Sequence, residues 1–482
     1  MSGRERIETE LVVVGAGAAG LYSALTAAGL GASVTVISAT PLAQTASYWA
    51  QGGLAAALGE DDSPQLHLAD TERAGRGLVR HAAAEILVNE APQMIADLQR
   101  IRIRFDADSG GDLALGLEGG HSRRRIVHAG GSSTGRRLAR QLSAALVRER
   151  RVTILEGRRA SNLWTEDGRV VGVICEDGLA VRARATVIAT GGAAALWQRT
   201  TNPPGSVGIG IMLARGAGAA VADLEFVQFH PTAVVGVPGR EGFLISEAIR
   251  GEGATLLGPD GERFVDELAP RDEVARAIWT QIETDSVDSV SLDMRSVDAG
   301  RFPSIDETLR QSGLDPRSDL IPVAPAAHYM MGGVVCDLDG ATTVGGLYVV
   351  GESACSGLHG ANRLASNSLS ECIVFGARAA RAALDEPATA GGEPPASLPL
   401  ELPSQATREA MWRSAGLVRD RAGLERLLDD PYPLAALVAR CALTREESRG
   451  SHWRSDFPAL DPALDSMHAV LQGSESAFEH WQ

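Results

Sequence analysis

Three features that the sequence lacks narrow the classes of protein to consider. Its five cysteines form neither a CxxC pair nor a Cys/His ligand spacing, so neither a disulfide framework nor a metal site is indicated. The apolar run after the charged N-terminus, Leu11–Val14, is too short for a signal peptide or a membrane span. We therefore expect a cytoplasmic protein without a membrane segment. The cysteines are Cys175, Cys336, Cys355, Cys372 and Cys441.

Positive charge is also scarce. The formal net charge of −16 argues against a general nucleic-acid binder, because binding to phosphates needs a basic surface. Two arginine runs, Arg123–Arg125 and Arg136-Arg137, are interpreted as solvated faces. The remaining composition, 44% hydrophobic and 22% charged, is typical of a globular chain with room for two or three domains.

A strand, a glycine-rich turn and a helix open the chain. The β-branched run 10–14 predicts a strand, GAGAAG follows it, and an Ala/Leu-rich helix and a second strand (33–38) come next. In such a GxGxxG turn the glycines permit a tight bend, close approach of a pyrophosphate and packing of the helix on the strand. Amide groups at the helix N-terminus favour a bound anion. This context predicts a dinucleotide site formed by Gly15, Ala16, Gly17, Ala18, Ala19 and Gly20.

Later segments favour FAD over NAD as this dinucleotide. ATVIATGG (185–192) and GLYVVGE (346–352) are typical of buried parallel strands that end in a loop at the carboxyl edge of a sheet. An apolar helix begins near residue 367, and its N-terminus can face an oxygen-rich ring or a phosphate. The second strand ends in a serine where an acid usually binds the ribose. Cofactor contacts are assigned here to Ser38, Glu352, Ser368 and Leu369.

Changes in composition divide the chain into domains. Residues 224–333 carry interspersed His, Arg, Asp and Pro, which predicts a second domain inserted into the FAD-binding domain formed by 1–223 and 334–388. A Pro/Gly/Ser/Ala-rich stretch predicts a linker over 389–404, and amphipathic stretches predict a helical domain over 405–482. The expected fold class is α/β (α+β overall), with a Rossmann-like FAD-binding domain, an inserted domain and a C-terminal helical domain.

Polar residues gather in the inserted region and shortly after it. Arginine forks bind carboxylates, and histidine adds a donor whose charge changes near neutral pH. Each residue alone has a structural explanation, such as a satisfied core histidine or a surface arginine. The set together suits a small dicarboxylate. Its members are Gln228, His230, Thr232, Ser246, Glu247, Arg250, Arg271, His328, Asn362 and Arg363.

Eight motifs, in chain order, resemble the succinate dehydrogenase/fumarate reductase flavoprotein superfamily, and within it the members that oxidise L-aspartate. The resemblance is close over roughly Glu10–Arg381 and looser through the C-terminal helices. It implies an FAD-binding domain interrupted by a capping domain, with the active site between them. The motifs are GAGAAG, ASYWAQGG, LEGGHSRRRIVHAGG, LEFVQFHPT, FLISEAIRGEG, LAPRDEVARAI, AHYMMGGV and GANRLASNSLSE.

The resemblance also implies roles for individual residues. Arg271 matches the proton-transferring arginine of the superfamily, and Glu118 matches an acid associated with the amino group of the substrate. Without the resemblance, Glu118 would be interpreted as a turn carboxylate beside two glycines. The contacts implied for a dicarboxylate substrate, L-aspartate or fumarate, are His230, Ser246 with Glu247, His328 and Arg363.

The stretch ASYWAQGG is unusual in a chain with only 4% aromatic residues. Paired glycines let a backbone approach a ligand closely. We expect the flavin ring against this stretch, with Gln51 and the glycine backbone at its polar edge and the two aromatic side chains packed nearby. The expected contacts are Ala46, Ser47, Tyr48, Trp49, Ala50, Gln51, Gly52 and Gly53.

Two positions depart from the superfamily pattern. Ile209 stands where an acid usually contacts FAD, so one cofactor contact is missing or replaced. Ala46 stands where members of membrane complexes attach FAD through a histidine, which indicates noncovalent FAD. The implied reaction is oxidation of L-aspartate to iminosuccinate with O₂ or fumarate as acceptor, the first step of NAD biosynthesis. Quinolinate synthase is the partner expected to take the product.

Two alternatives remain open at this point. A soluble fumarate reductase, or a succinate dehydrogenase-type subunit docked on an iron–sulfur partner, shares the same clamp residues. A flavin-binding scaffold without turnover would follow if Ile209 weakened FAD binding. Ala46 argues against a respiratory subunit, and Glu118 favours an amino-acid substrate, because only such a substrate carries an ammonium that needs an anionic partner.

Overall fold

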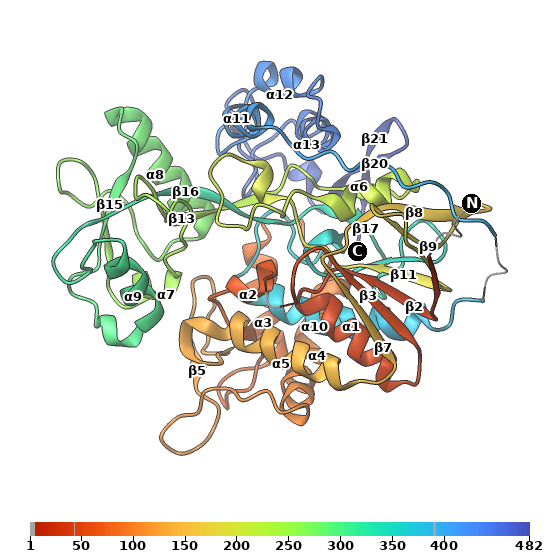
Figure 1. The fold of residues 1–482 in the computed structure, drawn as a ribbon. Helices are drawn as coiled ribbons and strands as arrows, with labels where there is room; N and C mark the ends of the chain where they lie inside the picture. Colours follow the sequence, from red (N-terminus) through yellow and green to blue (C-terminus); the bar gives the residue numbers. More distant parts are fainter. Residues whose placement is uncertain (1–4, 43, 389–391) are drawn as a thin grey trace.

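A parallel five-stranded sheet forms the centre of the computed structural model, which describes residues 5–42, 44–388 and 392–482 (Figure 1). The strand order is β18-β11-β2-β3-β7, so the first strand of the GAGAAG unit lies in the middle. Every residue of that strand is buried, as expected of a strand covered on both faces. The strands are β2 (Leu11–Val14), β3 (Val34–Ser38), β7 (Val152–Glu156), β11 (Ala185–Ile188) and β18 (Leu347–Val349).

The two faces of β2 pack against different layers. Leu11 and Val13 belong to a core shared with helices, whereas Val12 and Val14 belong to a core shared with a second sheet. Two helices of this layer, α1 and α10, are in direct contact, and a hydrogen bond of 3.0 Å from Ser23 Oγ to the carbonyl of Gly376 joins them. The helices are α1 (Ala18–Gly29), α3 (Pro64–Ala74), α4 (His81–Arg100), α5 (Thr134–Arg148) and α10 (Asn367–Ala383). The second sheet contains β1 (Arg6–Glu8), β8 (Ala160–Glu166), β9 (Arg169–Cys175) and β10 (Ala180–Arg182).

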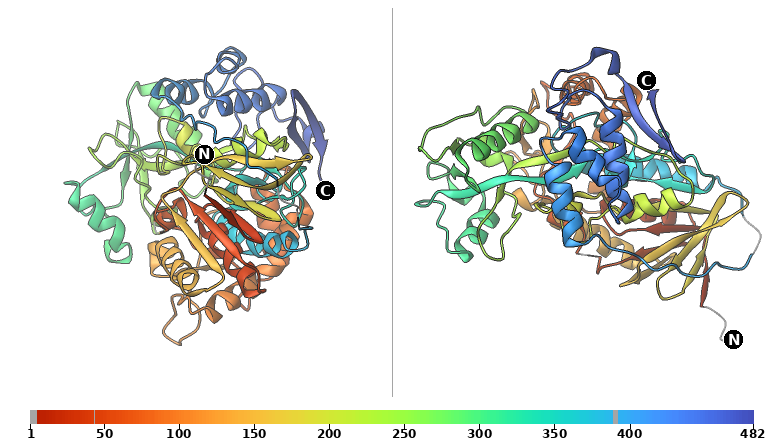
Figure 2. Two further views of the ribbon diagram at one scale, coloured as in Figure 1. Left: turned by 45° about the vertical axis from the view of Figure 1, so that its right-hand side comes forward. Right: turned by 90° about the horizontal axis from the view of Figure 1, so that it is seen from above.

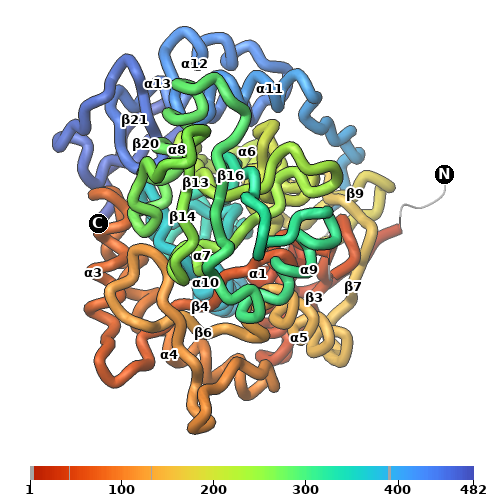
Figure 3. The backbone as a smooth tube through the Cα atoms, turned by 90° about the vertical axis from the view of Figure 1, so that its left-hand side faces the viewer, coloured from red at the N-terminus to blue at the C-terminus, as the bar shows by residue number. Residues whose placement is uncertain are grey.

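Residues 224–333, here called the lobe, build an antiparallel sheet of their own, β13-β16-β15-β14. The lobe projects from one side of the molecule in Figure 1 and faces the viewer in Figure 3. It has a separate apolar core to which Leu256 and Ile278 contribute. That the lobe is a domain distinct from the FAD-binding domain stays a prediction. Its elements are β13 (Val227–Val234), α7 (Glu247–Gly251), β14 (Thr255–Leu257), α8 (Arg271–Asp285), β15 (Val290–Asp293), α9 (Pro303–Gln311) and β16 (Ile321–Met330).

The C-terminal segment differs from the expectation of helices throughout 405–482. Helices α11 (Gln405–Ser414), α12 (Arg421–Leu427) and α13 (Pro433–Thr444) are followed by a hairpin of β20 (Met467–Gln472) and β21 (Glu475–His480) (Figure 2). The hairpin turns at Gly473, whose φ is 56°. Strand β20 joins β12 (Val221–Ala222), so its apolar residues are buried in a mixed sheet with β17 (Gly333–Val335) and β19 (Ala354–Cys355). Of the predicted linker, residues 389–391 lie outside the described part of the chain.

Short elements complete the fold around the cavity described below. A small antiparallel sheet joins β4 (Leu54–Ala55), β6 (Ile126–Val127) and β5 (Leu115–Gly116). Helix α2 covers Ala46–Trp49 and α6 covers Ile209–Gly216. No helix among the described residues has the length and apolar character needed to cross a bilayer. Short 3₁₀ turns occur at Gly131–Ser133, Ala194–Leu196, Ala299–Arg301, Gly351–Ser353 and Pro462–Leu464.

A buried ionic cluster ties the C-terminal segment to the root of the lobe. Arg445 donates to Glu225 Oε1 at 2.7 Å and to Glu447 Oε1 at 3.0 Å, and all three side chains are fully buried. Arg449 adds a bond to Glu447 at 2.8 Å, and Arg419 Nη1 donates to the carbonyl of Glu225 at 2.6 Å. Because a buried charge is tolerated only when paired, these bonds fix the geometry of the segment.

The loop at Gly450 and Ser451, in the same C-terminal segment, reaches two other parts of the molecule. The amide and hydroxyl of Ser451 both donate to the carbonyl of Ala361, at 3.0 and 3.1 Å. Arg276, on α8 of the lobe, donates to the carbonyl of Gly450 at 2.8 Å. Ala361 directly precedes Asn362 and Arg363, so the cluster fixes the loop that carries a predicted site residue.

Replacement of Arg445 by Met should lower the free energy of unfolding by about 3–5 kcal/mol, because Glu225 and Glu447 would be left as buried charges with fewer partners. The control is Arg421→Met, which breaks an ion pair with Glu446 between half-exposed side chains and should cost at most about 1 kcal/mol. Denaturant unfolding curves measure both variants. Equal losses in the two would contradict a special role for the cluster.

Candidate active site

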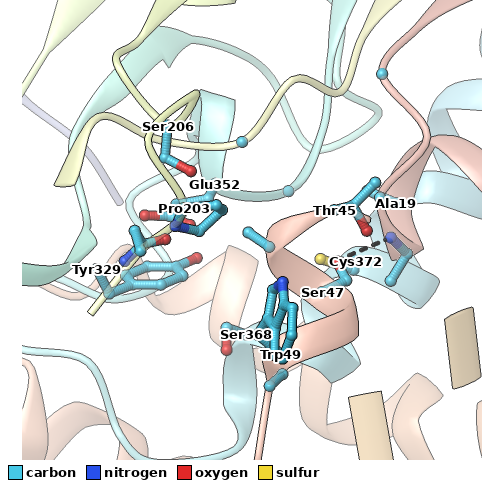
Figure 4. A pocket seen from close by; sticks show the side chains of 18 of the residues that line it. Ala19, Thr45, Ser47, Trp49, Pro203, Ser206, Tyr329, Glu352, Ser368 and Cys372 are labelled. Atoms are coloured by element: carbon cyan, nitrogen blue, oxygen red, sulfur yellow. Dashed lines mark hydrogen bonds between the residues drawn. The ribbon is translucent and has the colours of Figure 1, made fainter. Parts of the chain in front are cut away.

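A cavity of about 340 Å³ lies where the parallel sheet, the lobe and the start of α10 meet. Figure 4 shows Tyr329 and Glu352 on one side of it and Thr45 and Ser47 on the other. Of the residues predicted to bind cofactor or substrate, Gly20 and Tyr48 do not line it, and neither do Gln228, Thr232, Arg250 and Asn362 of the polar set. Those that do are Gly15, Ala16, Gly17, Ala18, Ala19, Ser38, Ala46, Ser47, Trp49, Ala50, Gln51, Gly52, Gly53, Glu118, His230, Ser246, Glu247, Arg271, His328, Glu352, Arg363, Ser368 and Leu369.

Gly20 and Tyr48 serve neighbouring structure instead. A Cβ on Gly20 would lie 2.0 Å from the carbonyl oxygen of Gly15, so this glycine lets α1 pack on the turn. The Tyr48 ring lies under the guanidinium groups of Arg136 and Arg140, at 5.4 and 5.7 Å from the ring centre. The expected packing of Tyr48 beside the cofactor is therefore replaced by cation–π contacts on the outer side.

The turn between β2 and α1 has the geometry of a ligand cradle. Gly15 has φ 112°, and a Cβ there would lie 2.2 Å from the carbonyl oxygen of Ala189, so only glycine fits. The amide of Ala18 donates to Ser47 Oγ at 3.0 Å, which ties ASYWAQGG to the first turn of α1. Across the cavity, a Cβ on Gly191 would meet no atom within 4 Å, so this glycine keeps space free. A Gly-bounded space at a helix N-terminus fits the pyrophosphate and ring system of FAD.

Two predicted FAD contacts, Ser38 and Glu352, and the departing position Ile209 have distinct surroundings. Ser38 Oγ donates to the carbonyl of Thr40 at 2.6 Å, so only its lone pairs are free for a ribose hydroxyl. Ile209 is the first residue of α6 and lines the cavity, where its side chain offers no hydrogen bond. Glu352 accepts the amide of Met330 at 3.0 Å, and burial raises the pKa of its carboxyl to about 7. A protonated Glu352 can donate to a ligand oxygen at neutral pH.

Arg363 is a buried cation that no carboxylate neutralises among the described residues. It donates to Ser368 Oγ at 2.5 Å and to Gln228 Oε1 at 3.1 Å, and its guanidinium lies 4.4 Å above the ring centre of Tyr329. Its Nε has no partner. Burial, and then the charge of Arg271, lower the pKa of Arg363 to about 10. A buried guanidinium without a carboxylate partner in a cavity wall favours an anionic ligand.

Gln228 connects Arg363 to Arg271 and was not assigned to the site from the sequence beyond its place in the polar set. Its Oε1 accepts from Arg363 Nη2 at 3.1 Å and from Arg271 Nη1 at 3.0 Å. Its Nε2 donates to Asn362 Oδ1 at 3.0 Å and to the carbonyl of Arg363 at 2.9 Å, which fixes the orientation of the amide. The alternation of QFHPT along β13 places Gln228 and His230 on one face of the strand, which was the available signal.

Two neutral histidines stand side by side in the cavity wall, with ring centres 5.3 Å apart. His230 Nδ1 accepts the amide of Thr232 at 3.3 Å, so the ring proton is on Nε2, which is buried and has no acceptor. His328 Nδ1 bonds to Thr201 Oγ1 at 2.8 Å. Burial lowers the pKa of both rings well below the usual value, and neighbouring arginines, Arg271 foremost for His230 and Arg363 for His328, lower it further. His230 thus presents an unused N–H donor to the cavity.

A chain of ionised groups leads from the cavity into the lobe. Arg271, the first residue of α8, donates from Nε to Glu247 Oε2 at 2.5 Å, and Arg250 lies 3.9 Å from the same oxygen. Burial opposes ionisation of Glu247, but Arg271 and then Arg250 outweigh it and hold the pKa of this carboxyl at about 2. Ser246 caps α7, where its Oγ accepts the amide of Ala248 at 3.4 Å.

Glu118 is a buried carboxylate for which the described residues offer no ion pair. Its Oε2 accepts from Ser366 Oγ at 2.6 Å, and its side chain lines the cavity. The glycine after it is required by close packing, since a Cβ on Gly119 would lie 1.8 Å from Glu247 Oε1. Glu118 and Arg363 therefore bring a buried carboxylate and a buried guanidinium to the cavity, each without an ion pair among the described residues.

The interpretation of Arg123–Arg125 as a solvated face is wrong for Arg125. Its side chain is fully buried and donates to Asp62 at 2.9 Å and to Asp70 at 2.6 Å. Arg123 is exposed as expected. The reason is that the run leads from an exposed stretch at Ser122–Arg124 into strand β6, so that its last arginine points inward. Only the fold supplies the two aspartates.

Comparisons with known proteins show the family to which the chain is related. Residues 10–369 match the model of the FAD binding domain family, and residues 427–479 match the fumarate reductase flavoprotein C-terminal family. The chain is 47% identical to the L-aspartate oxidase of Mesorhizobium japonicum, over 98% of this chain and 96% of that protein. It is 45% identical to the L-aspartate oxidase of Agrobacterium fabrum, over 93% and 91% of the two chains.

The chain belongs to the L-aspartate oxidase family. Its fold is similar to that of the E. coli quinol fumarate reductase flavoprotein, with a TM-score of 0.88 at 26% identity over 99% of this chain and 97% of that one. Members of this family are FAD-dependent oxidoreductases, and so is this protein. The predicted superfamily, fold class and FAD cofactor are thereby confirmed, while the roles of single residues stay predictions.

The buried histidines should make this family member sensitive to acid. His67 holds Asn367, at the start of α10, through a bond of 2.8 Å, and burial lowers the pKa of His67 to about 3. An unfolded histidine titrates near pH ~6.5, so below that pH protons favour the unfolded chain by about 1.4 kcal/mol per pH unit for each such residue. Stability is complete above about pH 6.5 and falls as the pH drops toward the folded pKa.

We therefore expect His67→Gln, which keeps a donor to Asn367 but cannot titrate, to lose less stability between neutral pH and about pH 5 than the unmodified protein. Thermal melts across that range measure the slope. His81→Gln is the control, because His81 is an exposed residue paired with Glu72 and should leave the slope unchanged. A slope in His67→Gln identical to that of the unmodified protein would contradict the neutral assignment.

Proposed function

We propose that this enzyme oxidises L-aspartate to iminosuccinate. The observation that carries the proposal is a pair of buried charged groups in the cavity lining that have hydrogen bonds but no ion pair among the described residues. They are the guanidinium of Arg363 and the carboxylate of Glu118. L-Aspartate has two carboxylates and an ammonium, so it supplies a counter-ion to each. The names of the relatives support the same substrate.

The donors around the cavity suit a clamp on both ends of a dicarboxylate. Arg363, with its free Nε, and His328 would hold one carboxylate. The free Nε2–H of His230 and the hydroxyl of Ser246 would hold the other. A substrate fixed at both ends presents its Cα–H in one orientation. Such positioning lowers the activation free energy, because the translational and rotational entropy is already lost on binding.

Bound FAD would accept the two electrons that leave the substrate. The residues that would hold it are the turn from Gly15 to Ala19, the stretch from Ala46 to Gly53, and Glu352 with Ser368 and Leu369. We propose that it is bound noncovalently, because the alanine side chain at position 46 has no nucleophile. Ile209 leaves one polar contact of the superfamily unmade.

Arg271 and Glu247 would control protons at the clamp. A guanidinium stays protonated in proteins, so Arg271 is a donor and not a base. Its link to the ionised Glu247 and on to Arg250 would let a proton be replaced after Arg271 has donated one. We assign this donation to the reduction of fumarate, and to Arg271 an electrostatic role while L-aspartate is oxidised. Glu118 would hold the substrate ammonium and take part in its deprotonation.

The proposal extends to the wider pathway on the strength of the family resemblance. Reoxidation by O₂, giving H₂O₂, or by fumarate would complete the cycle. The product would enter NAD biosynthesis in the cytoplasm through quinolinate synthase. A fumarate reductase without amino-acid oxidation is the second candidate, since the carboxylate clamp suits fumarate equally, and a scaffold without turnover is a third. Among the residues that line the cavity, only Glu118 favours the oxidation of L-aspartate over a fumarate reductase without amino-acid oxidation.

Anaerobic mixing of the purified yellow protein with L-aspartate should bleach the flavin absorbance, and succinate should bleach it much less. The physical reason is that succinate lacks the ammonium that Glu118 would bind. Stopped-flow absorbance measures both rates. Bleaching by succinate but not by L-aspartate would overturn the proposed substrate in favour of the fumarate reductase candidate.

Arg363→Leu should reduce kcat/KM for L-aspartate oxidation and for fumarate reduction alike, by about 100-fold or more, while FAD stays bound. Both substrates need the same carboxylate contact, and the variant removes its charge. The control is Arg381→Leu, which removes an exposed arginine from α10, the helix that follows Arg363, and should change neither reaction. Normal L-aspartate oxidation by Arg363→Leu would refute the clamp.

A further inference from the structure

A strained turn at the start of α10 lies directly beside Glu118. Ser366 has φ 60°, in the left-handed region that non-glycine residues seldom adopt. Such a residue persists only when its surroundings hold it, and it often marks a functional position. Ser366 is also buried and lines the cavity. None of the roles proposed above uses it.

The hydroxyl of Ser366 makes two hydrogen bonds, and its role as donor or acceptor in each is determined by its partner. It accepts the amide of Gly53 at 3.0 Å and lies 2.6 Å from Glu118 Oε2. Because the amide can only donate, the single hydroxyl proton is left for the carboxylate. A Cβ on Gly52 would lie 3.2 Å from Ser366 Oγ and 3.7 Å from Glu118 Oε1, so the two groups and the ASYWAQGG backbone are packed together.

The turn is held from behind by His121. Arg125 donates to His121 Nδ1 at 3.1 Å, and an arginine can only donate, so the ring proton is on Nε2. His121 Nε2 then donates to the carbonyl of Ala365 at 2.9 Å. Burial lowers the pKa of His121, which keeps the ring in this neutral form. Asp62 and Asp70 fix Arg125 in turn, so the turn rests on a buried chain of bonds.

We propose that Ser366, held in place by His121, is a positioning residue that determines specificity for an amino dicarboxylate. It fixes Glu118 through Oε2, so that Oε1 is kept for the ammonium of the substrate. This inference rests on the proposed function, because it assigns to Ser366 the orientation of the group that distinguishes L-aspartate from a dicarboxylate without an amino group. Substrates that lack the ammonium do not depend on it.

The experiment measures kcat/KM for L-aspartate oxidation and for fumarate reduction in Ser366→Ala and Ser366→Gly. The glycine variant accepts φ 60° without strain, so it separates loss of the hydroxyl from loss of the backbone conformation. In both variants we expect the ratio of the two constants, L-aspartate over fumarate, to fall about tenfold or more, the effect of a lost bond to a charged group. The loss should be mainly in KM for L-aspartate. The fall of this ratio in Glu118→Ala is the largest that we expect, because that variant removes the carboxylate itself.

Ser370→Ala is the matched control. Ser370 is equally buried one turn further along α10 and donates to the carbonyl of Ala55 at 2.9 Å, without contact to Glu118. It should leave the ratio unchanged. His121→Gln, which keeps a donor and an acceptor, should retain more of the ratio than His121→Leu, and FAD content per protein should stay the same in every variant.

The outcomes separate this inference from the proposed function. Failure of the unmodified enzyme to oxidise L-aspartate would overturn the proposed function, and the inference would fall with it. Normal L-aspartate oxidation with an unchanged ratio in Ser366→Ala would overturn the inference alone. Equal losses in both reactions, or the same selective loss in Ser370→Ala, would overturn it as well, because either result would show a general structural effect.

Discussion

One amide oxygen holds two guanidinium groups together at the centre of this molecule. Gln228 Oε1 accepts from Arg271 at 3.0 Å and from Arg363 at 3.1 Å, although the two cations repel each other. The repulsion is visible in the lowered pKa of Arg363, for which burial is the larger cause and Arg271 the next. Arg271 belongs to the lobe and Arg363 to the loop before α10, so the bridge exists only when both parts are in register. A carboxylate bound beside the two guanidinium groups would relieve this repulsion, and that relief would be a source of binding energy.

Two other buried arginines of the fold are neutralised by carboxylates. Arg125 is neutralised by Asp62 and Asp70, and Arg445 by Glu225 and Glu447. The first pair of contacts supports the turn beside Glu118, and the second fixes the root of the lobe and, through the C-terminal loop, the residues before Arg363. We interpret these ion pairs as structural, and the cavity charges without an ion pair, Glu118 and Arg363, as the groups that would bind the ligand. Their contrast is more informative than the presence of arginine in any one motif.

The sequence was sufficient for the parts of the structure that local pattern controls. The run LVVV, the GAGAAG turn and the apolar helix after Asn367 form the predicted elements, because burial and glycine conformation act over a few residues. It was insufficient where a partner comes from far along the chain. Arg125 needed two aspartates more than fifty residues away to become a core residue. The C-terminal hairpin needed β12, more than two hundred residues earlier, to bury MHAVLQ. The family motifs located most of the cavity, but they did not show that Gln228 bridges two arginines or that Ser366 joins Glu118 to Gly53.

The position of Glu118 explains why the cavity does not neutralise itself. A carboxylate and a guanidinium that line one small cavity would gain by pairing directly, and the site would then be closed to a zwitterion. No such pair forms among the described residues, because Ser366 engages one oxygen of Glu118, and Gln228 and Ser368 engage both terminal nitrogens of Arg363. Neutral hydrogen bonds therefore engage both charged groups, and neither is neutralised by an ion pair within the described part of the chain. The left-handed backbone of Ser366 agrees with this view, because a residue held in that conformation keeps its hydroxyl on Glu118.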